Sequence, residues 1–176
     1  HFRAGASGRI EGLTDHYYQG NRPNGIYIVR FRNLGDAASK RTDFLRGYGY
    51  QGSAAREGWG RGASAPGMGV ELKRRLHDAG GWLMSMTGFG ECLPRHENVV
   101  TLSDKTDEFG IPILRIDCSW GPNELAMRKD MKQSAMEMLD AAGLKNIVGN
   151  DDYKEGALGA EPGLGIHEMG TARMGR

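Results

Sequence analysis

The alternation of hydrophobic and polar residues along the chain predicts five or six short β-strands. We expect them at residues 2–11, 26–32, 44–53, 82–89, 99–102 and 113–118. A polar loop at 103–110 would join the last two as an antiparallel pair. Because the connections between these strands are mostly short, the pattern favours an antiparallel sheet over a parallel, doubly wound one.

The same alternation predicts which side chains share a face of each strand. In 26–32 we expect an apolar face of Tyr27, Val29 and Phe31, with Arg30 and Arg32 on the other face. In 44–53 Tyr48 and Tyr50 share a face, and in 82–89 Trp82, Met84 and Met86 do. In 113–118 the residues expected to point inward are Leu114, Ile116 and Cys118.

Two segments have helical spacing instead. A short amphipathic helix is expected after Pro66 and before Gly80, and a longer one over 122–142, with Pro122 in its first turn and Gly143 at its end. The long helix has an apolar stripe of Met127, Met131, Ala135, Met138 and Ala142. A methionine stripe suits core packing better than an adaptable binding surface, which is the alternative.

Together these elements predict a single α+β domain, an antiparallel sheet with helices packed on one face. The formal net charge of +1, from 23 basic and 22 acidic residues, provides no electrostatic footprint for nucleic acid. No apolar run approaches the roughly 18 residues of a membrane span. The pattern therefore favours a small neutral partner. We expect a soluble protein, and the compartment, cytoplasm or periplasm, stays open.

Neither zinc nor thiol redox chemistry is indicated by the cysteines and histidines. Cys92 and Cys118 form no Cys-x-x-Cys pair and have no accompanying histidine pair, so we predict no metal site. We interpret both cysteines as small buried residues, with a single disulfide possible if their strands are neighbours.

The most distinctive run is Gly165-Ile166-His167-Glu168-Met169-Gly170-Thr171-Ala172-Arg173-Met174-Gly175. Oxidation of a CH–OH group requires a base for the hydroxyl proton, and an imidazole of pKa about 6.5 can accept it near neutral pH. The flanking glycines permit unusual backbone angles and close approach of another group. The alternative is a surface loop without chemistry.

This run resembles the histidine segment of the glucose-methanol-choline (GMC) oxidoreductases, which reads roughly His-x-x-Gly-Thr-x-x-Met-Gly. The resemblance implies a flavoenzyme that transfers a hydride from an alcohol or sugar to FAD. It also implies that His167 is the active-site base, with Gly170 and Thr171 beside the flavin. The strand at 98–103 resembles one of the substrate-binding domain of this family.

A flavin domain should show a Gly-x-Gly-x-x-Gly turn between a strand and a helix. The Gly-x-Gly pairs at 88–90 and 163–165 do not continue into a third glycine, so we expect the flavin domain to lie outside this chain. The resemblance then implies a substrate-binding domain at 1–164 and the start of a return segment at 165–176. The second active-site residue of the family has no counterpart, and the isolated chain is expected to be inactive.

Substrate contacts would come from polar side chains on a sheet that roofs the flavin. Arg30, Arg32, Gln51 and Trp82 are the candidates, although each also suits an ordinary surface or packing role. The main alternative function is a stand-alone, non-catalytic binding module. A metal or thiol enzyme is a weaker alternative.

Overall fold

The computed structural model describes residues 2–13, 25–58, 67–77, 80–151, 162 and 170. Five strands form an antiparallel sheet in the order β2-β3-β4-β1-β7. Their bounds are β1 Phe2–Ile10, β2 Ile26–Ile28, β3 Tyr48–Arg56, β4 Trp82–Gly90 and β7 Lys145–Asn150. A separate hairpin pairs β5 (Val99–Thr106) with β6 (Pro112–Asp117), and the helices are α1 (Gly69–His77) and α2 (Pro122–Ala141). The predicted α+β architecture is confirmed.

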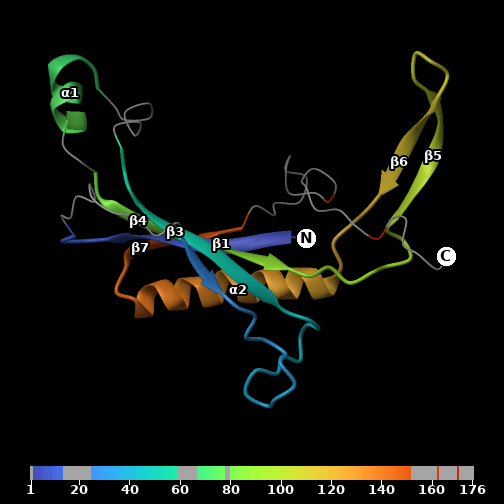
Figure 1. Ribbon diagram of the computed structural model, residues 1–176, viewed down its shortest axis with the longest axis horizontal. Helices are drawn as coiled ribbons and strands as arrows, with labels where there is room; N and C mark the ends of the chain where they lie inside the picture. Colours follow the sequence, from blue (N-terminus) through green and yellow to red (C-terminus); the bar gives the residue numbers. More distant parts are fainter. Residues whose placement is uncertain are drawn as a thin grey trace.

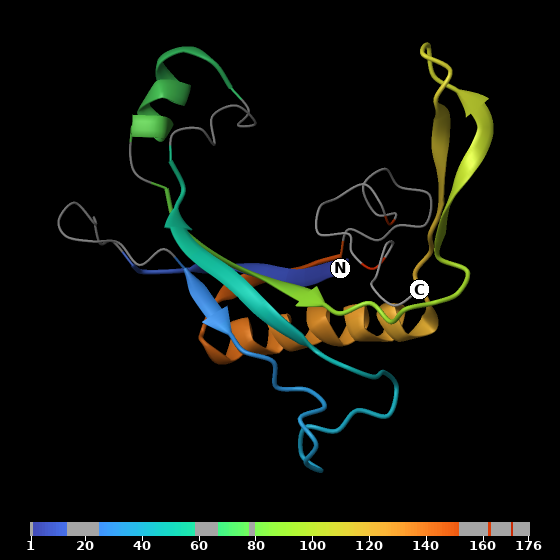
Figure 2. The ribbon, with the colours of Figure 1, turned by 45° about the vertical axis from the view of Figure 1, so that its right-hand side comes forward.

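Helix α2 covers one face of the sheet, while α1 and the hairpin extend on the opposite side (Figures 1 and 2). Pro122 occupies the first turn of α2, as predicted, and Gly143 follows its end with a φ of +84°, a backbone region open to glycine. The Leu144 N–H then donates to the Leu139 carbonyl at 3.1 Å, which closes the last turn.

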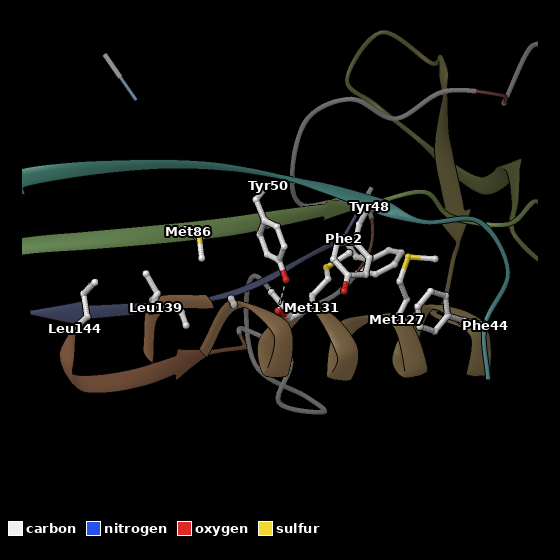
Figure 3. Close-up of a cluster of buried hydrophobic side chains, with 12 residues drawn as sticks. Phe2, Phe44, Tyr48, Tyr50, Met86, Met127, Met131, Leu139 and Leu144 are labelled. Carbon is white, nitrogen blue, oxygen red and sulfur yellow. Dashed lines mark hydrogen bonds between the residues drawn. The ribbon is translucent and has the colours of Figure 1, made fainter. Parts of the chain in front are cut away.

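The hydrophobic core lies between α2 and the three strands β1, β3 and β4 (Figure 3). Its buried members are Phe2, Ala4, Ala6, Phe44, Tyr48, Tyr50, Met86, Met127, Met131, Ala135, Leu139 and Leu144. The predicted stripe is therefore a packing surface at Met127, Met131 and Ala135, whereas Ala142 is exposed. The predicted inward faces of β3 and β4 are also confirmed.

Residues 47–52 match the spacing Gly-x-Gly-x-x-Gly, but they form no phosphate-binding turn. Most of this run lies within β3, and the tyrosines between its glycines are buried in the core. The glycines serve strand packing instead: a Cβ on Gly52 would come within 2.5 Å of the Ser85 carbonyl oxygen, and one on Gly49 within 3.0 Å of that of Ile28. The match in spacing therefore carries no sign of a dinucleotide site.

The carboxylate of Glu124, in the first turn of α2, hydrogen-bonds to the chain on both sides of the β5–β6 hairpin. Glu124 is 2% exposed and accepts the backbone N–H of Leu93, before β5, and of Gly121, after β6, each at 2.9 Å. Next to it, Asn98 donates to the Ser119 carbonyl at 3.2 Å and accepts the Ser119 N–H at 3.1 Å. The base of the hairpin is thus held by the hydrogen bonds of two side chains, the buried Glu124 and the half-buried Asn98.

The prediction that Leu114, Ile116 and Cys118 point inward is wrong. Leu114 and Ile116 are 61% and 57% exposed, and Cys118 is an exposed thiol. The alternation is real, but the hairpin projects away from the sheet and no described element covers it (Figure 2). Cys92 is a free thiol, half-buried, and burial raises its pKa.

The predicted apolar face of 26–32 is wrong at two of its three residues. Strand β2 is only three residues long, and Tyr27 and Val29 are 69% and 65% exposed. Phe31 packs against the core as predicted, and Ile28, which was expected on the other face, packs there as well.

Two further elements differ from expectation. The short helix α1 buries none of its residues, so the prediction that both helices pack on the sheet holds only for α2. Strand β7 was not predicted, because Lys145–Asn150 has little apolar alternation, and of its residues only Ile147 packs against the core.

Candidate substrate-facing surface of the sheet

The face of the sheet that points away from α2 carries two neighbouring cross-strand rows of small, uncharged polar side chains. The register places Ser53 opposite Ser85, and Ser85 opposite Ser7. One pleat away, Gln51 lies opposite Thr87, and Thr87 lies opposite Gly5. Asn150 of β7 completes the second row beside Gly5. We call this set, Ser7, Gln51, Ser53, Ser85, Thr87 and Asn150, the hydroxyl face.

Alternation along the strands explains how the hydroxyl face forms. Residues of β1, β3 and β4 with the opposite parity, such as Ala6, Tyr50 and Met86, are buried under α2, so the next residue on each strand must point the other way. Ser53, Gln51 and Asn150 are exposed, and Ser7, Ser85 and Thr87 are half-buried. The Asn150 amide donates to Ser7 Oγ at 3.5 Å, the limit of a hydrogen bond.

Charged groups on this side lie at the two ends of the sheet and not in its centre. Arg3 lies beside Phe89 at one end. At the other end, Arg9 forms a two-point ion pair with Glu57, with both N···O distances 2.8 Å. The centre of the hydroxyl face thus presents donors and acceptors without a net charge.

Of the four residues predicted to contact substrate, Gln51 lies on the hydroxyl face. Trp82 shares the parity of Met86 and is 8% exposed, so its ring packs on the α2 side. The guanidinium of Arg32 binds Asp130 on α2, and Arg30 Nη2 donates to the Asn33 carbonyl at 2.8 Å beyond the end of β2. The structure therefore does not bring these four residues together.

The five other residues of the hydroxyl face were missed by reasoning from sequence. The available signal was the alternation of side chains along a strand. If Tyr48 and Tyr50 point toward the core, then Gln51 and Ser53 must point away from it. If Met86 points toward the core, its neighbours Ser85 and Thr87 must point away from it. The strand order and register, which bring the serines together, are long-range facts that this signal does not contain.

His167 and Thr171 of the histidine motif lie outside the described residues. Gly170 is described: it is exposed, its φ is +94°, and no atom of the described residues lies within 4 Å of the position that a Cβ would take. A left-handed backbone without a side chain can be approached closely by a flat group. The place of Gly170 beside a flavin stays a prediction.

A buried arginine of α2 binds Asp151, the residue that follows β7 in the chain. Arg128 of α2, whose side chain is 4% exposed, donates through Nε and Nη2 to Asp151 Oδ1 at 3.2 and 2.5 Å. Lys132, one turn further along α2, lies 3.8 Å from the same carboxylate. Asp151, which follows Asn150 of the hydroxyl face, is thereby fixed in place.

The described residues contain no group of three or more histidine, cysteine, aspartate or glutamate side chains placed to hold a metal ion. In the same part of the chain, no helix has the length and apolar character needed to cross a membrane.

The described residues form a sheet with one helix-covered face and one polar face, and the histidine motif follows β7 in the sequence. Residues 94–176, which include this motif, match the family model described as GMC oxidoreductase. Over these residues the chain is similar to the GMC oxidoreductases, as its histidine motif predicted. No curated protein and no solved structure matches it significantly.

Proposed function

We propose that the protein oxidises a CH–OH group of an alcohol or sugar, with FAD as the hydride acceptor and His167 as the base. The observation that carries the proposal is the motif from His167 to Gly175, which lies inside the segment that matches the GMC oxidoreductases. In this proposal residues 1–164 form the substrate-binding domain and 165–176 begin the return to a flavin domain of the same polypeptide.

The residues of this chain would have three roles: a base, contacts to the flavin and contacts to the substrate. The His167 imidazole takes the hydroxyl proton of the substrate, which raises the electron density on the reacting carbon. Gly170 and Thr171 would lie against the flavin, where the bare backbone of Gly170 permits a close approach. The hydroxyl face would hold the rest of the substrate, with Gln51 among its contacts. FAD, when bound, supplies the hydride-accepting chemistry.

The test is His167→Ala in the full-length protein that contains this chain. We expect turnover to fall by about 10²- to 10⁴-fold, the usual contribution of a general base, while the flavin absorbance of the purified protein is retained. The matched control is His96→Ala, at an exposed histidine in the turn before β5. A loss of less than about tenfold for His167→Ala, or an equal loss for the control, would contradict the assigned role.

A further inference from the structure

We propose that Arg128 is a positioning residue for the oxidation. By binding Asp151, it fixes the point at which the segment that carries His167 leaves the sheet. This inference rests on the proposed function, in which His167 is the base. The observations that carry it are the contacts between α2 and three successive residues at the end of β7, Gly149, Asn150 and Asp151.

One stripe of α2 lies against the end of β7. Arg128, Lys132 and Met136 follow one another at intervals of four residues, so they share a face of the helix. This stripe leaves no room for a side chain at position 149. A Cβ on Gly149 would come within 2.9 Å of the aliphatic stem of Lys132 and of the Met136 sulfur. Strand β7 therefore lies directly on α2 just before it ends.

The next two residues are held by hydrogen bonds and charge. Asn150 pairs with Gly5 of β1 in the register of the sheet. The Asp151 carboxylate accepts Arg128 Nε and Nη2 at 3.2 and 2.5 Å, and Lys132 Nζ lies 3.8 Å from its other oxygen. The lysine thus covers Gly149 with its stem and reaches Asp151 with its charge. The chain leaves the sheet at a defined place.

The burial of Arg128 indicates that this placement matters. Its side chain is only 4% exposed, whereas that of Asp151 is 24% exposed. Removal of a cation from water is unfavourable unless a well-placed partner compensates, and an apolar residue of similar volume often gives equal or greater stability. The arginine adds geometric definition instead, because its charge is compensated when Asp151 lies against α2. We attribute its presence to that definition.

A fixed starting point for the return segment has a direct bearing on the proposed base. Several glycines lie between Asp151 and His167 in the sequence, and glycine restricts the backbone least, so composition alone does not set the place of His167. A general base must lie within hydrogen-bond reach of its proton, and a displacement of about 1 Å can cost about 100-fold in rate. Arg128 would therefore influence turnover through His167, without contact to the substrate.

The first experiment measures amide hydrogen exchange in the full-length, flavin-containing protein. Arg128→Met removes the charge and keeps a long side chain, and exchange over residues 165–175 should become at least about tenfold faster. The matched control is Asp130→Asn, which disrupts a different ion pair of α2, the one with Arg32. Unchanged exchange in Arg128→Met, or equal acceleration in the control, would overturn the inference.

The second experiment compares turnover, with the alcohol that reduces the flavin fastest in a panel of primary and secondary alcohols. Arg128→Met should lower kcat about tenfold or more and change KM less than about threefold, because the base is displaced while the substrate contacts remain. Arg128→Lys keeps the charge and should restore part of kcat. A loss of kcat no larger than that of Asp130→Asn, or an effect on KM alone, would contradict the inference.

A milder variant keeps the inference testable if Arg128→Met does not fold. Lys132 is 39% exposed, and Lys132→Met should accelerate exchange over residues 165–175 in the same direction; no acceleration would overturn the inference. If no alcohol reduces the flavin of the unmodified protein, the oxidoreductase proposal fails, and exchange alone decides whether Arg128 positions the segment. If an alcohol reduces the flavin and exchange is unaffected by Arg128→Met, this inference fails and the proposed function stands.

Discussion

Arg32 and Asp130, 98 positions apart in the sequence, form a two-point ion pair that fastens the connection between β2 and β3 to α2. Arg32 Nε and Nη2 lie 2.9 and 3.2 Å from the two carboxylate oxygens. Arg41 adds a contact at 3.0 Å, and the Tyr48 hydroxyl donates to the same carboxylate. Asp130 is 8% exposed, so this single buried anion organises two cations and a phenol.

Asp130→Asn should therefore destabilise the protein strongly. The substitution leaves the Arg32 guanidinium half-enclosed without its counter-charge, and breaking a buried pair costs about 3 kcal/mol. The measurement is urea unfolding at neutral pH. Asp117→Asn is the matched control, because the Arg115–Asp117 pair is exposed and worth at most about 1 kcal/mol. An equal loss of unfolding free energy in the two variants would show that the Asp130 cluster does not stabilise the protein as proposed.

The buried phenols of Tyr48 and Tyr50 should make stability fall in alkali. Burial raises the pKa of both above the ordinary value of 10, and the contact with Asp130 raises that of Tyr48 further. The unfolded chain then releases protons that the folded chain retains, so the stabilisation present below about pH 10 is lost as pH rises above it. Each phenol contributes a slope of up to about 1.4 kcal/mol per pH unit.

Tyr50→Phe tests this dependence. The variant loses the hydrogen bond to the Met131 carbonyl (2.6 Å), about 1 kcal/mol at neutral pH, but its stability should fall less steeply above about pH 10. Urea midpoints measured at several pH values give the slope. Tyr27→Phe is the control, since this ring is 69% exposed. A slope in Tyr50→Phe identical to that of the unmodified protein would contradict the prediction.

Gly5 should tolerate no side chain, although it lies on the polar face of β1. A Cβ there would stand 1.9 Å from the Met86 carbonyl oxygen of the neighbouring strand, so β1 and β4 would have to separate. We expect Gly5→Ala to cost about 3 kcal/mol or more, measured by thermal unfolding. Gly58→Ala is the matched control, because no atom in the described part of the chain lies within 4 Å of its Cβ position. A cost for Gly5→Ala as small as that of the control would be incompatible with this strand spacing.

Removal of the Glu124 carboxylate should release the base of the hairpin. Glu124→Ala leaves the N–H groups of Leu93 and Gly121 without their acceptor, at about 1–3 kcal/mol, and amide hydrogen exchange at both positions should accelerate. Glu137→Ala is the control, since its carboxylate is exposed and accepts a hydrogen bond from the Gln133 side chain at 2.8 Å. An unchanged rate of amide hydrogen exchange at Leu93 would contradict a stabilising role for its hydrogen bond to Glu124.

The sequence predicted elements well where a buried partner enforced its pattern. Tyr48, Tyr50 and Met86 face α2 because the helix is there to cover them, and the methionine stripe of α2 packs as expected. The same alternation failed at Leu114 and Ile116, because nothing in a strand pattern tells whether another layer exists above it.

Long-range geometry explains the rest. The row of Ser53, Ser85 and Ser7 depends on β4 lying between β3 and β1, and the Arg32–Asp130 pair joins segments 98 residues apart. Neither relation is encoded in local periodicity. The histidine motif was found from its spacing alone, whereas Gly47–Gly52 matched a spacing and proved to be strand packing. Spacing is informative only when the local structure that it needs is also present.

The exposed side of the hairpin has a practical consequence for work with this chain. Leu102, Leu114 and Ile116 form a strip of branched aliphatic groups, each more than half in contact with water. Such a strip lowers colloidal stability, so the purified chain should cluster as its concentration rises and as salt strengthens apolar association. Lysine at Leu102 and Leu114 would remove that tendency without touching the core, and would give the form best suited to crystals and NMR.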